Sequence, residues 1–447
     1  MLHKYSFEKP AFMSVVEKIC LFTGLMTLIA MVFCHLLNYQ VPGFWIFTLI
    51  LLSFSIAGFS WSKYRNATSG MLNHGIRFSS LTNRGWMSIL TTVSITVFYI
   101  LLYWRPEYLG YHPEGNYGFV SWFDPLSMFL KNQTASQWFV YGVFYTAAIL
   151  LFGIRFILKY QHAPNQVIRT ISVMFFQLFF AFLIPEFMLR MNLPYSDLKN
   201  MWPLNYSFFD HWNLASLQSN GWIGTCILWI GLSMIFIISP LLTYFFGKRW
   251  YCSWVCGCGG LAETAGDPFR HLSDKSEKAW KLEQLLISSI LLFVILMTAG
   301  VLYTFRTGQP ELFGVSTAAL RKSYGFFIGA AFSGVIGVGF YPLLGSRVWC
   351  RFGCPMAALL GIQQKLFSRF RITTNGGQCI SCGNCSTYCE MGIDVRSYAQ
   401  KGQNIVRASC VGCGICATVC PRGVLKLENG SLDIFHRLPS GNPNRTN

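Results

Sequence analysis

The sequence predicts a mainly α-helical protein that crosses a membrane several times and carries a small cysteine-rich α+β domain near its C-terminus. Three observations support this fold class. Of the 447 residues, 53% are hydrophobic and only 12% are charged, whereas soluble chains carry about a quarter charged residues. Long apolar stretches recur along most of the chain. Half of the 16 cysteines lie between positions 379 and 420.

Eight apolar stretches are each long enough to span a bilayer, which takes about 17 to 25 residues. They lie near 18–38, 43–61, 86–104, 138–158, 170–188, 221–246, 284–305 and 323–345. With the N-terminus inside, the inner segments hold all but seven of the 35 Lys and Arg residues. This is the positive-inside pattern, so we expect a bacterial inner-membrane protein with both termini in the cytoplasm. The charge of +17 then reflects topology and contact with lipid, and we expect no nucleic-acid partner.

We expect four regions along the chain. Residues 1–217 form a membrane region with helices one to five and aromatic outer loops. Residues 218–370 form a membrane core, residues 371–427 the cysteine-rich domain, and residues 428–447 a polar tail with little to pack.

The cysteine-rich domain contains the pattern C-x-x-C-x-x-C-x-x-x-C twice. This is the ligand spacing of bacterial ferredoxins that hold two [4Fe–4S] clusters, in which the fourth cysteine of each run ligates the other cluster. We therefore expect cluster 1 on Cys379, Cys382, Cys385 and Cys420, and cluster 2 on Cys410, Cys413, Cys416 and Cys389. Zinc is the alternative, since C-x-x-C pairs also bind zinc. A four-ligand zinc site does not explain two triplets that are each followed by a fourth cysteine.

The two runs differ at the residue after their last cysteine. Pro421 follows the second run, whereas Glu390 stands at this place in the first. A carboxylate here either shifts the potential of its cluster through its charge or is simply solvated.

A second cysteine pattern repeats at the ends of two predicted helices. The segment GKRWYCSWVCGCGGLAE from Gly247 and the segment GSRVWCRFGCPMAALLG from Gly345 align without gaps. In one interpretation four of their five cysteines bind a further metal centre, for which four thiolates suffice, with Cys258 as a substitute for one of the other four. In the other, the motif only ends the helices and anchors the domain, and in either case Arg249 and Arg347 are expected to contact lipid headgroups. The five cysteines are Cys252, Cys256, Cys258, Cys350 and Cys354.

Two C-x-x-x-C motifs at helix ends, followed by a two-cluster module, resemble the membrane polyferredoxins of the NosR, NapH and CcoG type over about residues 220–427. The family's motif is C-x-x-x-C-P. Pro355 keeps the proline in the second copy, whereas Gly257 replaces it in the first and is followed by Cys258. The resemblance implies an electron-transfer component of a quinol dehydrogenase or oxidoreductase system. It would pass single electrons between a cytoplasmic donor or membrane quinol and a partner enzyme, which is periplasmic in the NapH-like case. The alternative is an assembly factor that reduces a metal or thiol for a respiratory metalloenzyme.

The predicted outer loops are rich in aromatic residues, most of which fit an interfacial belt. The sharper hypothesis is a docking surface or quinol pocket, in which a histidine and an aspartate accept protons. Its candidate residues are Asp124, Glu186, Asp210 and His211. Because the bilayer core is about 30 Å thick, electrons that cross it need a quinone, a further subunit or a centre at the repeated motif.

Overall fold

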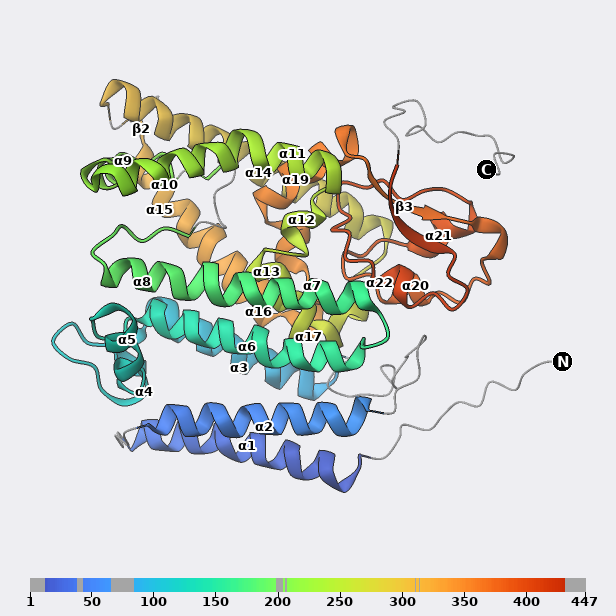
Figure 1. Ribbon diagram of the computed structural model, residues 1–447, viewed down its shortest axis with the longest axis horizontal. Helices are drawn as coiled ribbons and strands as arrows, with labels where there is room; N and C mark the ends of the chain where they lie inside the picture. The colour runs from blue at the N-terminus through green and yellow to red at the C-terminus, as the bar shows by residue number, and fades with distance from the viewer. Residues whose placement is uncertain are drawn as a thin grey trace.

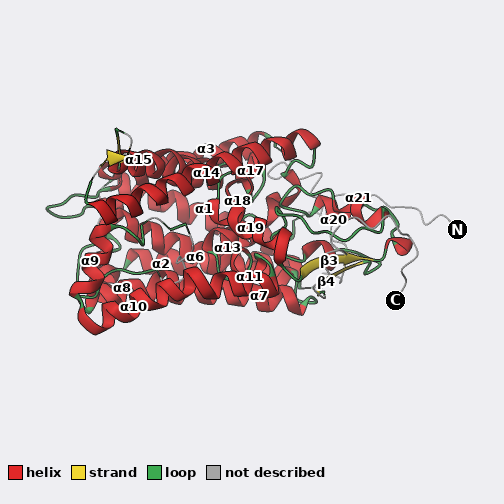
Figure 2. Ribbon diagram, turned by 90° about the horizontal axis from the view of Figure 1, so that it is seen from above, coloured by secondary structure: helices red, strands yellow, loops and turns green. Residues whose placement is uncertain are grey.

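The computed structural model describes residues 13–37, 43–65, 84–197, 204–205, 207–309, 311–312 and 314–430. Long helices lie side by side in a bundle, and a small domain projects from one end of it (Figures 1 and 2). The mainly helical class predicted from the sequence is confirmed. The predicted tail from residue 431 onward lies outside the described residues.

Seven described helices are long and apolar enough to span a membrane. Apolar side chains cover their outer surfaces, as shown by Trp222 and Phe54, which are 80% and 73% exposed. Such a surface suits contact with lipid, since soluble proteins rarely expose large apolar patches. The seven are α1 (Val15–Leu36), α2 (Phe44–Tyr64), α3 (Trp86–Trp104), α6 (Gln137–Lys159), α14 (Glu277–Thr307) and two composite helices. The composites are Pro164–Arg190, made of α7 (Pro164–Phe175), η3 (Phe176–Leu183) and α8 (Ile184–Arg190), and Gly221–Phe246, made of α10 (Gly221–Ser233), η5 (Met234–Ile238) and α11 (Ser239–Phe246).

Local sequence explains where several of these helices begin and end. Ser14, Ser136 and Ser276 precede α1, α6 and α14, and each hydroxyl accepts a backbone N–H of the first helical turn. Serine is a favoured N-cap because this bond satisfies an otherwise unpaired donor. Gly308 ends α14 with φ of 72°, a left-handed conformation that glycine adopts without strain.

The eighth predicted span, 323–345, differs from the other seven. It is divided into α15 (Thr317–Tyr324), the π-helical η7 (Gly325–Ile336), α16 (Gly337–Gly339) and α17 (Tyr341–Leu344). Frequent glycines and the charged start of α15 keep it out of the set of continuous apolar spans found among the described residues. The glycines instead allow close packing on α3: a Cβ at Gly334 would lie 2.5 Å from the Tyr103 ring.

Short elements close both ends of the bundle. The end far from the small domain carries η2 (Pro106–Leu109), α4 (Gly118–Ser121), α5 (Asp124–Lys131), α9 (His211–Ser219) and the strands β1 (Glu311–Leu312) and β2 (Val315–Ser316) (Figure 1). The remaining short helices of the membrane core are α12 (Arg249–Cys252), α13 (Gly257–Thr264), η6 (Asp267–Leu272), α18 (Val348–Phe352) and α19 (Pro355–Phe367). The helix α13 folds back into the bundle against α6 and α7. Gly260 permits this approach, because a Cβ there would lie 2.2 Å from the Val173 side chain.

The small domain has one antiparallel strand pair and three short helices. The strands β3 (Phe370–Thr374) and β4 (Leu425–Asn429) pair from Phe370 with Asn429 to Thr374 with Leu425. The three helices are α20 (Asn384–Thr387), α21 (Val395–Gln400) and α22 (Ile415–Thr418). The short 3-10 helix η8 (Gly376–Gln378) precedes them in the chain. One hydrophobic cluster joins Phe370 and Ile372 to Cys252 and Cys350 of the membrane core. The domain is therefore packed firmly onto the bundle.

Candidate iron–sulfur and thiol centres

The cysteines of the small domain surround two separate cavities. The first is lined by Cys379, Cys382, Cys385 and Cys420. The second is lined by Cys389, Cys410, Cys413 and Cys416. In each cavity the fourth cysteine comes from the other sequence run, which is the crossed arrangement that the spacing predicts.

Backbone geometry wraps each run around its cavity. Gly383 and Gly414 precede the third cysteine of each run with φ of 82° and 76°, a left-handed conformation that favours glycine. Backbone N–H groups then donate to the sulfurs, as Gly412 does to Cys410 and Ile415 does to Cys413. Such bonds are the usual surroundings of cluster ligands and tune the potential.

The sulfurs of the two quartets are not gathered as closely as a zinc site requires. Tetrahedral zinc with bonds of 2.3 Å holds its sulfurs about 3.8 Å apart. Within the described part of the chain, no three cysteine sulfurs lie within 4.8 Å of one another. The quartets therefore lack the close sulfur spacing of a zinc site, and their sequence pattern is the one that holds [4Fe–4S] clusters.

The two cavities differ in exposure. Cys382 is exposed and lies beside Ile380, which is 51% exposed, so the first cavity opens to solvent. Cys410 and Cys416 are only 8% and 7% exposed. The second cavity lies against the bundle, where Gln166 of α7 donates to the Cys413 carbonyl at 2.9 Å.

The five cysteines of the repeated motif come together between the bundle and the domain. Burial raises the pKa of the Cys252 thiol to about 12, and the thiols of Cys256 and Cys350 act on it in the same direction. Cys354 lies near the same three thiols, and Cys258 is hydrogen-bonded to Cys256 and to Tyr145 of α6. We call this set (Cys252, Cys256, Cys258, Cys350 and Cys354) the thiol pocket.

The two copies of the motif have equivalent local structures. Cys256 is the residue before α13, and Cys354 is the residue before α19. The Cys354 sulfur accepts a hydrogen bond from the Ala357 N–H at 3.4 Å, as an N-cap side chain does. The motif thus begins helices and also brings its thiols together, so both interpretations of the repeat capture part of its structure.

Arg347 is not a lipid anchor, contrary to the sequence-based expectation, because it is only 1% exposed and lies among protein groups. Its guanidinium pairs with Glu263 at 2.5 Å and Glu390 at 3.0 Å, and contacts the Cys350 sulfur at 3.6 Å. Arg249 stacks on the rings of Trp254 and Phe370, which likewise belong to the protein. The reason is that the small domain covers the segments that follow α11 and α17, where these two arginines lie.

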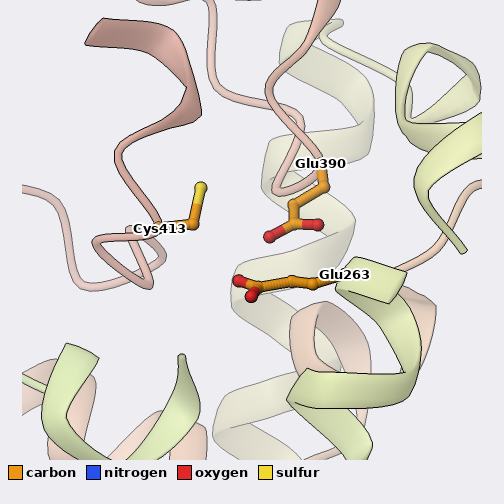
Figure 3. A group of neighbouring side chains, drawn as sticks. All are labelled: Glu263, Glu390 and Cys413. Carbon is orange, nitrogen blue, oxygen red and sulfur yellow. The ribbon is translucent and has the colours of Figure 1, made fainter. Parts of the chain in front are cut away.

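Glu390 is buried, which rules out the solvated alternative. Burial disfavours its charge, but Arg270 at 2.9 Å and Arg347 outweigh this and hold its pKa below the usual range. Figure 3 shows Glu263 and Glu390 facing each other beside Cys413, and their ligand atoms lie within 4.8 Å of one another. This trio is not a good cation site, because arginines already neutralise both carboxylates.

The outer acidic residues each have a local partner. Asp124 accepts from Asn116 and from the Ala135 N–H, both at 2.7 Å. Glu186 pairs with Lys131 at 3.6 Å, and Asp210 pairs with Arg321. The side chain of His211 lies outside the described residues. The quinol pocket stays a prediction that these contacts do not favour.

Sequence reasoning missed the buried cations that meet the carboxylates. Arg169 of α7 pairs with Glu263, and Lys159 at the end of α6 pairs with Asp267 at 2.6 Å. Their positions at the ends of apolar stretches were the available signal, since charged residues there need a partner. Arg270 and Arg347 carried no such signal because they lie outside the apolar stretches.

Comparison with known proteins points to iron–sulfur electron transfer. Residues 378–425 match a family model described as a 4Fe-4S dicluster domain, and residues 228–276 and 326–373 match a model described as a 4Fe-4S binding domain. The chain is 28% identical over 177 residues to YccM of Escherichia coli (strain K12), which is named as a candidate electron transport protein. The aligned region covers 38% of this chain and 48% of that relative. It is 24% identical over 197 residues to the methylamine utilization ferredoxin-type protein MauN of Methylobacillus flagellatus. That match covers 39% of this chain and 65% of the relative.

The chain thus spans less than two thirds of each of these relatives. No solved structure gives a significant match. The matches support a polyferredoxin-like membrane protein with an electron-transfer role. The second family model covers both copies of the repeated cysteine motif.

Proposed function

We propose that this chain is an electron carrier of the bacterial inner membrane, which passes single electrons between a redox partner and the membrane core through two [4Fe–4S] clusters. Cys379, Cys382, Cys385 and Cys420 would hold cluster 1, and Cys389, Cys410, Cys413 and Cys416 would hold cluster 2. When bound, each cluster supplies a reversible one-electron change without bond chemistry. The protein's own contribution is to hold the eight thiolates and to orient backbone N–H groups toward them.

The observation that carries the proposal is the order of the centres from solvent to bundle. The first cavity contains the exposed Cys382, whereas the second contains the buried Cys410 and Cys416 and lies where the domain meets α7. The thiol pocket follows inside the membrane core and shares one hydrophobic cluster with both cavities. A partner would exchange electrons at cluster 1, and cluster 2 would connect it to the core.

We propose that the thiol pocket holds a further iron–sulfur centre. Five buried or half-buried thiols offer one more than a cluster requires. The match of both motif copies to a 4Fe-4S binding model supports this assignment. Such a centre would shorten the distance that an electron must still cover to a quinone or to an outer partner.

The positive-inside asymmetry of the sequence supports a cytoplasmic position for the small domain. A soluble cytoplasmic protein or a membrane quinol is then the electron donor, and a further redox enzyme the acceptor. One observation favours the alternative of an assembly factor: the fifth thiol gives the pocket more soft ligands than an iron–sulfur cluster uses, and soft ligands also suit metal ions such as copper(I).

The test is the amount of iron and acid-labile sulfide per chain in anaerobically purified protein, together with EPR of the reduced sample. Two clusters supply about eight of each, and a third centre adds an excess. We expect the excess to disappear in a Cys252→Ser/Cys350→Ser double variant and to persist in Cys226→Ser, whose cysteine lies in an apolar helix.

About eight irons with no loss in the double variant would leave the thiol pocket without a cluster and favour the assembly alternative. A protein that binds zinc instead of iron would contradict the electron-carrier proposal as a whole.

A further inference from the structure

The two clusters would lie in different electrostatic surroundings. Around the second cavity, ionic side chains are buried in the seam between the bundle and the domain. Lys248 and Arg347 are 2% and 1% exposed, and Arg270 is 1% exposed. Around the first cavity, the charged side chains among its lining residues are Arg396 and Arg422, and both are exposed.

The buried charges contact the ligands of cluster 2 directly or through one neighbour. Glu263 and Glu390 lie within 4.8 Å of the Cys413 sulfur (Figure 3). Arg270 and Arg347 pair with Glu390, the residue next to Cys389. On the other side of the cavity, burial raises the pKa of Cys410 while Lys248 acts to lower it, which places this ammonium near that sulfur.

Positive charge is in excess in this buried set. Five cations face three carboxylates, and each of these eight residues is at most 4% exposed. The neighbouring buried pair of Arg351 and Glu283 adds one charge of each sign and leaves the excess unchanged. The cations are Lys159, Arg169, Lys248, Arg270 and Arg347, and the carboxylates are Glu263, Asp267 and Glu390. Every carboxylate is paired with two cations, so its negative charge is cancelled locally.

Reduction adds one negative charge to a cluster, and nearby positive charge stabilises that added charge. The effect is strong for buried groups, because little water lies between them and the cluster. The exposed Arg396 and Arg422 act on cluster 1 through solvent and salt, which screen them. Burial alone works in the opposite direction for cluster 2, since it disfavours added charge, and the excess of cations offsets it.

We propose that the eight buried ionic side chains raise the reduction potential of cluster 2 above that of cluster 1. An electron that enters at cluster 1 is then transferred to cluster 2, beside the membrane core. In this step cluster 1 is oxidised by one electron and cluster 2 is reduced by one, with no proton or bond change. The inference rests on the proposed function and gives the direction of electron transfer, which is inward from the more exposed cluster 1 to the bundle.

Arg347 is the positioning residue of this arrangement. Its guanidinium touches Glu390 beside cluster 2 and the Cys350 sulfur of the thiol pocket. It also donates to the Cys252 carbonyl at 3.2 Å. The same cation therefore faces both the second cluster and the next centre inward, and stabilises negative charge on either of them.

The test is an anaerobic potentiometric titration of the purified full-length protein, followed by EPR. We expect one reduction step for each of the two domain clusters, separate from any step of the thiol-pocket centre, and Arg347→Gln lowers the higher of these two. Arg347→Lys, which keeps the charge, leaves that step near its wild-type position. Arg396→Gln, which removes an exposed cation beside cluster 1, produces a smaller shift of the lower step. If Arg347→Gln does not fold, Glu390→Gln serves as the second variant and raises the higher step.

The proposal is overturned if Arg347→Gln or Glu390→Gln moves the lower step, or if neither variant moves either step while Arg396→Gln does. An equal shift in Arg347→Gln and Arg347→Lys would also contradict it, because packing and not charge would then set the potential. Absence of any cluster signal in the wild-type protein is a different result, which refutes the proposed function itself.

Discussion

Glu263 is the residue whose loss should most clearly weaken the joint between the bundle and the small domain. It is 3% exposed and accepts from two buried guanidiniums, those of Arg169 and Arg347. Glu263→Ala removes the carboxylate and leaves both cations buried. Breaking a buried pair by deleting one partner costs about 3–5 kcal/mol, because an uncompensated charge remains.

The matched control is Glu277→Ala. Glu277 also pairs with a cation, Lys281 at 2.8 Å, but both side chains are 71% exposed. An exposed pair of this kind contributes about 0.3–0.5 kcal/mol. The two variants therefore remove the same chemical group and should differ about tenfold in their cost.

The assay is thermal unfolding of both variants in detergent, followed by circular dichroism and by the accessibility of the buried cysteines to a maleimide. We expect Glu263→Ala to lower the unfolding midpoint strongly and to expose cysteines of the seam earlier, with Glu277→Ala close to the wild type. Equal midpoints for the two variants would refute the reasoning that the seam depends on this ion pair.

Three further predictions follow from local contacts. Gly334→Leu forces a side chain against Tyr103 and should lower the free energy of unfolding by about 1–3 kcal/mol. Gly329→Leu is the control, because a Cβ there meets only a carbonyl at 3.8 Å, and it should change the midpoint little in the same thermal assay. His35→Ala leaves the Tyr108 carbonyl and the Phe119 N–H without the imidazole that now bonds both, so the free energy of unfolding should fall by about 1–3 kcal/mol in the same assay. An unchanged unfolding midpoint would show that these two bonds do not stabilise the fold. An iron chelator should remove cluster 1 before cluster 2, since Cys382 is exposed and Cys416 is buried, and EPR after timed exposure would reveal the reverse order if this is incorrect.

The sequence predicted the parts of this fold that depend on local pattern. The predicted span 86–104 has the same bounds as α3, because apolar length alone defines a membrane helix. The crossed cysteine quartets also follow from spacing, since a short loop can place three thiols around one cavity and must send the fourth elsewhere. Both inferences need only residues that are close in sequence.

The sequence could not place groups that meet through tertiary packing. Glu263, Arg347 and Glu390 lie in three separate segments, and their burial depends on how the small domain covers the loops of the bundle. The return of α13 into the bundle is similar, because it depends on the contact of Gly260 with Val173. Composition favours a membrane anchor for a loop arginine, so only the fold reveals that Arg347 pairs inside the protein.

The most direct test of the account is where a single electron goes. Oxidised protein would be mixed with less than one electron equivalent of a reduced viologen, frozen at successive times and examined by EPR. The account predicts that the signal of cluster 1 appears first and then declines as the signal of cluster 2 grows to dominate at equilibrium. An electron that stays on cluster 1 would contradict it. So would a cluster 2 that fills equally fast in a Cys382→Ser variant lacking cluster 1.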